Sequence, residues 1–375
     1  MNSKSPRVAS RASTLLPGRA TADATARFAK RAASRFAPDF HRPLDGGLLV
    51  SSIGLGTYLG DCGDAEDAAY ATTAHGALAS GVNLLDTAIN YRCQRSERAV
   101  GRALSRAVRD HTVERDEVVV CTKGGYIPLD GTPPESREAY HAYLAREYFD
   151  RGIMTPADVV GGGHSLAPSF LADQIDRSRA NLGVASIDVY YVHNPEQQLD
   201  AITPEQLGDR LRGAFALLEE RCASGDIGLY GCATWNGLRA HPGARDHLEL
   251  AELVAIAREV GGDAHHFRVV QLPVNLVLAE GVRTPTQHVE GRAMTVLEAA
   301  ARLGVSVVAS AALLQSKLAA NLPPAIREAL PGFATDAQRA IAFVRSLPVV
   351  SSALVGMKSL DHLAENLGAA TAGRA

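Results

Sequence analysis

Four residues that could together perform acid–base chemistry lie at or shortly after the ends of short apolar segments: Asp86, Tyr91, Lys123 and His193. Such a set suits the delivery of a proton to a carbonyl oxygen as that oxygen gains negative charge. A free tyrosine has a pKa of about 10, which is too high for it to act readily as both acid and base near neutrality. A lysine ammonium beside Tyr91 would stabilise the phenolate and lower that pKa. Asp86 would hold the charged Lys123 in place, and His193 would orient the carbonyl by hydrogen bonding.

Each of these residues also has an ordinary structural explanation when it is taken alone. Asp86 could cap the following helix and Tyr91 could be a packing residue. Lys123 could simply be solvated, and His193 could be a hydrogen-bonded core histidine. The chemical interpretation therefore depends on a fold that brings all four side chains to one place.

The body of the chain predicts alternating strands and helices. Short apolar segments, which suit parallel strands buried on both faces, occur at residues 53–57, 82–86, 117–122, 187–193, 227–233, 267–272, 305–309 and 349–355. Amphipathic segments that predict helices lie between them, among others at 65–80, 96–108, 168–182, 204–224, 247–260 and 294–303. Eight strands, each followed by a helix, indicate an α/β protein with a closed (β/α)8 TIM barrel. In such a barrel, chemistry sits at the carboxyl ends of the strands.

The predicted domain organisation is one barrel with additions. Residues 42–370 form the barrel, which begins with a β-hairpin and carries a long insertion at 124–163 after the third strand, and 371–375 form a tail. Residues 1–41 form a basic arm: the first 42 residues hold nine Lys and Arg against two Asp. The arm could be partly disordered with a short helix at 25–36, a targeting segment, or a contact for an anionic partner.

Composition and charge exclude several classes of protein. The chain is 46% hydrophobic and 21% charged, with a net charge of −3, which argues against a nucleic-acid partner bound by bulk basic charge. It lacks the run of about 18 apolar residues that a membrane helix needs. Its five scattered cysteines indicate a reducing, cytoplasmic location rather than a disulfide scaffold or zinc ribbon. No metal site is expected, because no His-x-His occurs at a strand end.

A glycine-rich segment offers a competing interpretation. Gly54-Leu-Gly56-Thr-Tyr-Leu-Gly60 is similar to a dinucleotide-binding fingerprint between a strand and a helix, and Asp86 loosely satisfies the acidic residue expected further on. A single match of this kind is a weak signal, and the other seven strand ends favour the barrel.

The motifs themselves resemble the aldo-keto reductase superfamily. The sequences that carry the resemblance are Leu85-Asp-Thr-Ala-x-x-Tyr91 followed by Ser96-Glu97 and Gly101, Val120-Cys-Thr-Lys123, Ile187-Asp-Val-Tyr-Tyr-Val-His193, the opening Arg42-Pro-Leu and Ser52-Ile-Gly-Leu-Gly-Thr57, and the closing Val355-Gly-Met-Lys-Ser-Leu with Glu365-Asn366. The resemblance implies an NAD(P)H-dependent oxidoreductase that interconverts aldehydes or ketones and alcohols by hydride transfer. Tyr91 would be its general acid and base.

The resemblance also implies a site for NADP(H), or less often NAD(H), across the barrel mouth. Gln271 would bind the nicotinamide carboxamide, Glu365 and Asn366 the adenine, and the segment Gly356-Met-Lys358-Ser359 the 2′-phosphate. Three positions depart from the family pattern: Thr234 or Asn236 stands where Ser-Asn is usual, Ser310 replaces a stacking tyrosine, and His362 replaces an arginine. The expected cofactor contacts are completed by Gly56, Thr57, Tyr58 and Asp86.

The substrate, a small carbonyl compound or alcohol, is expected to contact Tyr58, Tyr126, His164 and Trp235. His164 could instead cap the helix that begins near residue 168. The aromatic residues of the insertion could line this pocket or pack into a small core of their own. A different class of function is also open: a cofactor-binding interaction or sensor subunit with little turnover, in which the basic arm binds the partner. An oligomer is compatible with either function.

Overall fold

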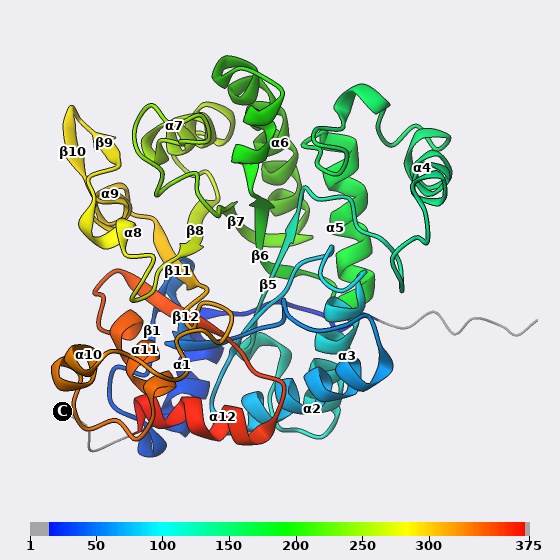
Figure 1. The fold of residues 1–375 in the computed structure, drawn as a ribbon. Coiled ribbons are helices and arrows are strands. Elements are labelled where there is room, and N and C mark those ends of the chain that lie inside the picture. The colour runs from blue at the N-terminus through cyan, green and yellow to red at the C-terminus, as the bar shows by residue number, and fades with distance from the viewer. Residues whose placement is uncertain (1–14, 372–375) are drawn as a thin grey trace, which may run out of the picture.

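The computed structural model describes residues 15–371, and eight parallel strands close into a barrel at its centre (Figure 1). The strands are β3 (Ile53–Gly56), β4 (Leu84–Asp86), β5 (Val119–Gly124), β6 (Ile187–His193), β7 (Ile227–Ala233), β8 (Phe267–Pro273), β11 (Ser306–Ser310) and β12 (Val350–Gly356). They pair in chain order, and β12 pairs with β3 to complete the ring. The predicted TIM barrel is confirmed, with every strand within two residues of its expected bounds.

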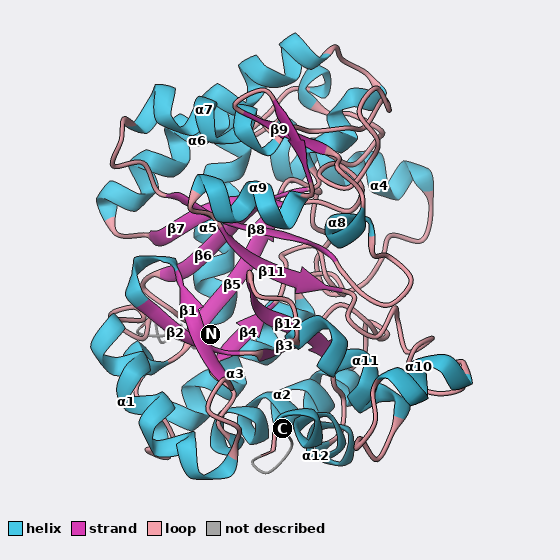
Figure 2. Ribbon diagram, turned by 90° about the vertical axis from the view of Figure 1, so that its left-hand side faces the viewer, coloured by secondary structure: helices cyan, strands magenta, loops and turns pink. Residues whose placement is uncertain are grey.

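Helices form the outer layer of the barrel, as Figure 2 shows. They are α2 (Asp64–Ser80), α3 (Arg95–Arg109), α5 (Pro168–Leu182), α6 (Pro204–Ser224), α7 (Leu250–Gly261), α9 (Val296–Leu303), α11 (Asp336–Arg345) and α12 (Leu360–Leu367). Local sequence sets their ends. Thr203 caps α6 in a reciprocal pair with Gln206, and Gly183 ends α5 in the left-handed conformation with φ of 68°. Shorter elements lie in the loops: α4 (Arg137–Leu144), α8 (Glu280–Arg283), α10 (Pro324–Ala329) and the hairpin of β9 (Gln287–Val289) and β10 (Arg292–Met294).

The glycine-rich segment belongs to the barrel wall. A Cβ atom on Gly54 would lie 2.7 Å from Leu84 Cδ2 and 2.9 Å from Leu354 Cδ2, so any side chain at this position of β3 would force buried side chains of the neighbouring strands to shift. The dinucleotide-fold interpretation of this segment is therefore wrong, because the glycine serves packing inside a closed barrel.

The amino-terminal part of the described chain packs against the barrel. The expected hairpin is present as β1 (His41–Leu44) and β2 (Leu48–Ser51). Helix α1 (Ala22–Ala32) lies on it, where Thr25 Oγ1 accepts a hydrogen bond from the Leu49 amide and Arg31 makes a bidentate ion pair with Glu117. Residues 1–14 of the basic arm lie outside the described residues.

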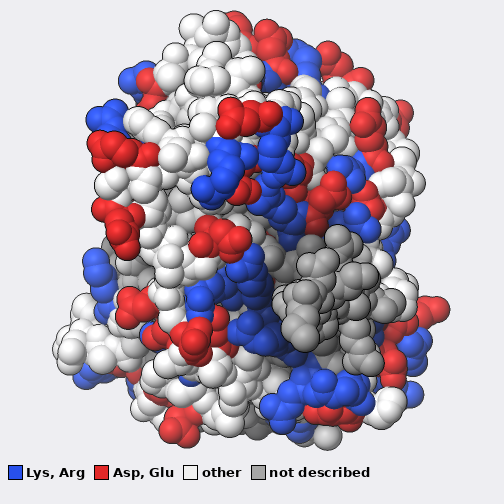
Figure 3. All heavy atoms as spheres, turned by 90° about the vertical axis from the view of Figure 1, so that its right-hand side faces the viewer, with Lys and Arg blue, Asp and Glu red and all other residues white. Residues whose placement is uncertain are grey.

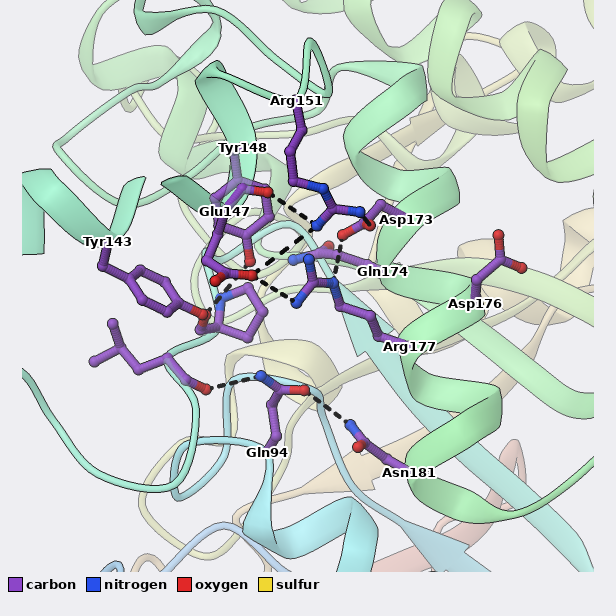
Figure 4. A network of polar contacts seen from close by, with 12 residues as sticks. Gln94, Tyr143, Glu147, Tyr148, Arg151, Asp173, Gln174, Asp176, Arg177 and Asn181 are labelled. Atoms are coloured by element: carbon purple, nitrogen blue, oxygen red, sulfur yellow. Dashed lines mark hydrogen bonds and ion pairs between the residues drawn. The ribbon is translucent and has the colours of Figure 1, made fainter. Parts of the chain in front are cut away.

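The insertion keeps a small hydrophobic core of its own. Tyr148 is fully buried there against Phe170 of α5, and Tyr143 donates a hydrogen bond to the Pro128 carbonyl. Two ion pairs join the insertion to α5 (Figure 4): Glu147 contacts Arg177, and Arg151 contacts Asp173. Arg177 and Asp173 also pair with each other within α5. Of the two alternatives for the aromatic residues, the separate core is observed for all but Tyr126.

Charges of both signs lie side by side on the face that Figure 3 presents. The ion pairs of the described chain include Arg221 with Asp226 and Arg179 with the same Asp226. Within residues 15–371, no helix combines the length and the apolar character that crossing a bilayer requires.

Candidate active site

The pleat of the strands places one polar residue from each of several strands at the same end of the barrel. Each strand first places a residue in the barrel interior, two positions before the residue at its cavity end; these interior residues include Leu84, Cys121, Tyr191 and Val269. Because strand side chains alternate, the next inward positions are also directed to the barrel axis, one layer higher: Asp86, Lys123, His193, Ala233, Gln271, Ser310 and Gly356. These positions lie at the carboxyl ends of their strands, where barrel enzymes hold their catalytic groups.

The four residues singled out first are brought together at this end. Lys123 Nζ donates to Asp86 Oδ1 at 2.5 Å and to the Thr87 carbonyl at 2.8 Å, and its side chain is 1% exposed. The ammonium lies 5.1 Å from the ring centre of Tyr91. The rings of Tyr91 and His193 are 5.8 Å apart in an edge arrangement. Tyr91 thus stands between a buried cation and an imidazole.

Burial and charge set the protonation states of this group. Burial alone would lower the pKa of Lys123, but the Asp86 carboxylate more than offsets this and the pKa is raised, so Lys123 is a cation at neutral pH. Burial raises the pKa of Tyr91 above its usual value, and the Lys123 charge works against that rise. The expected net lowering of the Tyr91 pKa is therefore wrong for the free protein: the lysine acts as predicted, but desolvation is larger. Burial, aided by Lys123, holds the pKa of His193 well below its usual value, so this imidazole is neutral.

A cavity of about 520 Å³ opens above these groups. Many of the predicted contacts line it: Gly56, Thr57, Tyr58, Asp86, Tyr91, Tyr126, His193, Thr234, Trp235, Gln271, Ser310 and Gly356. Tyr58 and Trp235 are 56% and 43% exposed, respectively, so they present aromatic surface at the cavity mouth. The cavity has the size and mixed lining typical of small-molecule sites.

Part of the lining was missed by the sequence analysis. After β11 the chain turns through four non-glycine residues in the left-handed region, Ala311, Leu314, Gln315 and Ser316, and three of these reach the cavity. Glycine is the usual sequence signal of a left-handed turn, and this segment contains none. Its position was the available signal, because barrels often bind phosphate with the loops after strands seven and eight.

The three residues predicted to bind the carboxamide lie in different surroundings. Gln271 Nε2 donates to Asp86 Oδ2 at 2.8 Å, so Gln271 supports the carboxylate while it lines the cavity. Thr234 Oγ1 is buried in the cavity wall with no hydrogen-bond partner within residues 15–371. The Asn236 side chain instead accepts from Arg239 at 2.7 Å and lies outside the main cavity. Of the pair offered by the sequence, Thr234 is the residue that lines the main cavity.

The predicted adenosine contacts lie beyond this cavity, on the segment that leads into α12. Lys358 is exposed and forms an ion pair with Glu66 at 2.9 Å. Ser359 caps α12 by accepting from the His362 amide. The remaining two residues lie further along α12, namely Glu365 and Asn366, of which Asn366 is 4% exposed. The main cavity includes Gly356 but none of these five residues.

His164 does not form a pocket wall. It is 1% exposed, its Nε2 donates to the His193 carbonyl at 2.7 Å and its Nδ1 accepts from Gln198 at 2.6 Å. The N-cap of α5 is Ala167, so the capping alternative is also wrong. Burial lowers the pKa of His164 to about 4. Through its hydrogen bond to the His193 carbonyl, this neutral ring holds the backbone of His193 in place.

A second recess of about 350 Å³ shares Tyr126, Asn194 and Trp235 with the main cavity. Its lining includes three acidic residues and no Lys or Arg: Glu196, Asp200 and Asp246. Glu196 Oε1 accepts from the amides of residues 235, 236 and 237 at 2.7–3.2 Å, which holds the loop after β7. The recess is therefore polar and acidic, in contrast to the aromatic mouth.

The fold and this arrangement define a barrel with a tyrosine, lysine, aspartate and histidine at its carboxyl end. The family model of the aldo/keto reductase family matches residues 52–251, more than half of the 375 residues. The chain belongs to the aldo/keto reductase family.

Solved structures support the fold. An aldo/keto reductase from Klebsiella pneumoniae, in complex with NADP and acetate, is 19% identical with a TM-score of 0.59, covering 88% of this chain and 89% of that one. An aldo-keto reductase from Bacillus halodurans in its holo form is 19% identical with a TM-score of 0.56, at 88% and 90% coverage. A glycerol dehydrogenase from Gluconobacter oxydans is 18% identical with a TM-score of 0.56, at 88% and 89% coverage. No curated protein sequence matches the chain.

Proposed function

We propose that the protein is a cytoplasmic NAD(P)H-dependent oxidoreductase that interconverts small aldehydes or ketones and the corresponding alcohols. The observation that carries this proposal is the buried Lys123–Asp86 ion pair, whose ammonium lies 5.1 Å from the Tyr91 ring centre, with the neutral His193 beside Tyr91 at an open cavity. Family membership supports the cofactor and the reaction class.

In the proposed reaction, Tyr91 donates its phenolic proton to the carbonyl oxygen during reduction and takes it back during oxidation. Lys123 stabilises the phenolate that this leaves, because its charge is fixed by Asp86 in a site of low polarity. His193, which is neutral, can donate a hydrogen bond from its ring N–H to the carbonyl oxygen without competing as an acid. A reduced nicotinamide, when bound, supplies the hydride.

An unsatisfied polar atom in the cavity wall also supports the binding of such a cofactor. Thr234 Oγ1 is a buried hydroxyl at the cavity wall without a partner in the described part of the chain, and a buried polar atom of this kind needs a ligand or water to satisfy it. Gln271 and Ser310 line the same wall. We assign Thr234 and Gln271 to the carboxamide, and Gly356, Lys358, Ser359 and His362 to the phosphate end, with Glu365 and Asn366 toward the adenine.

The experiment that tests the proposal uses Trp235, the single tryptophan of the chain, at the cavity mouth. Titration with NADPH and with NADH is expected to quench its fluorescence, with NADPH acting at lower concentrations because Lys358 and His362 favour a phosphate. A screen of aldehydes should then show turnover that Tyr91→Phe removes. Binding without turnover of any carbonyl compound would favour the sensor subunit, and a failure of both cofactors to bind would refute the proposal.

A further inference from the structure

The loops after β3 and β4 bring two of the five cysteines together. Cys62 Sγ lies 3.5 Å from Cys93 Sγ, and all five cysteines are free thiols. A disulfide needs its sulfur atoms about 2.05 Å apart, so a closure of about 1.5 Å would suffice. The other three are each buried elsewhere, on β5, α6 and β7: Cys121, Cys222 and Cys232.

The backbone on both sides of the pair is held without help from the sulfur atoms. Arg92 Nε donates to the Asp61 carbonyl at 2.9 Å, and its Nη2 donates to the Gly63 carbonyl at 3.3 Å, so one guanidinium holds both neighbours of Cys62. The Cys93 carbonyl accepts from the Gly131 amide at 3.0 Å. The two thiols therefore face each other because the loops are fixed in that arrangement.

The two thiols differ in access. Cys62 is partly exposed, whereas Cys93 is 6% exposed. Burial, together with the neighbouring Cys62, raises the pKa of Cys93 to about 12. A dissolved oxidant therefore meets Cys62 first, and Cys93 is placed to react with the product.

We propose that Cys62 and Cys93 form a reversible oxidation site, in which a peroxide converts the two thiols into a disulfide that ties the loop after β3 to the loop after β4. The Cys62 thiolate attacks one peroxide oxygen, which breaks the O–O bond and leaves a sulfenic acid and hydroxide. The Cys93 sulfur then attacks the Cys62 sulfur, its proton leaves with the sulfenic oxygen as water, and the S–S bond forms. Two thiols lose two electrons in total, and hydrogen peroxide is reduced to two waters. A dithiol reductant reverses the change.

The tie would act on the cavity. The loop after β3 carries Tyr58, whose ring lies 5.0 Å from that of Tyr91. In the loop after β4, Cys93 follows Tyr91 by two residues. Three consecutive residues there have left-handed backbone conformations: Arg92, Cys93 and Gln94, with φ of 49°, 55° and 67°. Such a segment has little freedom to absorb a movement locally. Drawing Cys93 toward Cys62 should therefore displace Tyr91 and slow turnover.

The test is mass spectrometry of the full chain after hydrogen peroxide treatment, followed by unfolding, alkylation and proteolysis. The expected result is a loss of about 2 Da, a fall in titratable thiols from five to three, and a crosslinked peptide joining residues 62 and 93, all reversed by dithiothreitol. Cys62→Ser and Cys93→Ser should each abolish the crosslink, whereas the matched control Cys222→Ser should retain it.

The outcomes separate this proposal from that of the function, because the crosslink is detected without activity. Retention of five thiols, random pairing, or oxidation of Cys62 to the sulfinic acid without a crosslink would each overturn it. Where a carbonyl substrate is turned over, oxidised protein should be at least several-fold slower than reduced protein, and Cys62→Ser should lose that difference. Equal rates for a fully crosslinked protein would overturn the displacement of Tyr91.

Discussion

Replacing Lys123 by methionine tests how strongly the buried ion pair of Lys123 with Asp86 stabilises the folded protein. Lys123 and Asp86 are 1% and 3% exposed, respectively, so the substitution leaves a buried carboxylate whose remaining side-chain donor is Gln271. Breaking a buried ion pair by removing one partner costs about 3–5 kcal/mol. We expect a loss of that size in the free energy of unfolding of Lys123→Met, measured by urea denaturation at neutral pH.

The same reasoning fixes how the loss depends on pH. Burial already raises the pKa of Asp86, and Lys123 is the largest opposing influence, so the pKa rises further in Lys123→Met. A carboxyl whose folded pKa lies above its unfolded value binds more protons in the folded state, and stability therefore falls as pH rises through that interval. The difference from the wild type should be smaller near about pH 5 than near about pH 8.

A double-mutant cycle provides the control. Asp86→Asn combined with Lys123→Met removes both charges, and we expect the double variant to be at least about 2 kcal/mol more stable than the sum of the single losses indicates. Additive losses, or a Lys123→Met deficit that is the same at both pH values, would refute the assignment of a coupled buried pair.

Three further predictions concern the reaction, the substrate and the barrel wall. Tyr91→Phe should reduce carbonyl turnover by about 10²- to 10⁴-fold while cofactor binding, followed by fluorescence, stays nearly unchanged; unaltered turnover would exclude Tyr91 as the acid. The acidic recess should disfavour anionic substrates, so kcat/KM for carboxybenzaldehyde should be about five- to tenfold below that for benzaldehyde. The double variant Asp200→Asn, Asp246→Asn should reduce this difference in kcat/KM. A higher kcat/KM for carboxybenzaldehyde would contradict the role of the recess. Gly54→Ala should lower the free energy of unfolding by about 1–3 kcal/mol through overpacking. Gly56→Ala should lower it little, because the added Cβ would meet no atom closer than 3.9 Å. Thermal denaturation of the two variants measures the difference.

The fold was predictable because strand and helix signals along the chain agree with each other. The apolar segment ending at His193 and the helix at Pro168–Leu182 were predicted with the bounds that the structure shows. Once the barrel was expected, the strand ends indicated which side chains meet at the cavity, because the same alternation that buries Tyr191 directs His193 to the cavity.

Tertiary contacts decided the features that could not be predicted. The sequence around His164 does not reveal that its ring is enclosed by the His193 backbone and Gln198. Nor do the residue types in the loop after β11 indicate its left-handed turns, since Ala311 and Gln315 favour other conformations when isolated. The net direction of the Tyr91 pKa depends on the depth of burial, which no spacing of residues conveys.

The insertion of residues 124–163 has a consequence for how such an enzyme can diversify. Its hydrophobic cluster and its ion pairs to α5 are separate from the clusters of the barrel, so it should open and close as a local folding unit at a free energy below that of global unfolding. Through Tyr126 it also reaches the cavity. Substitutions in this segment can therefore change which molecules enter while the barrel stays intact.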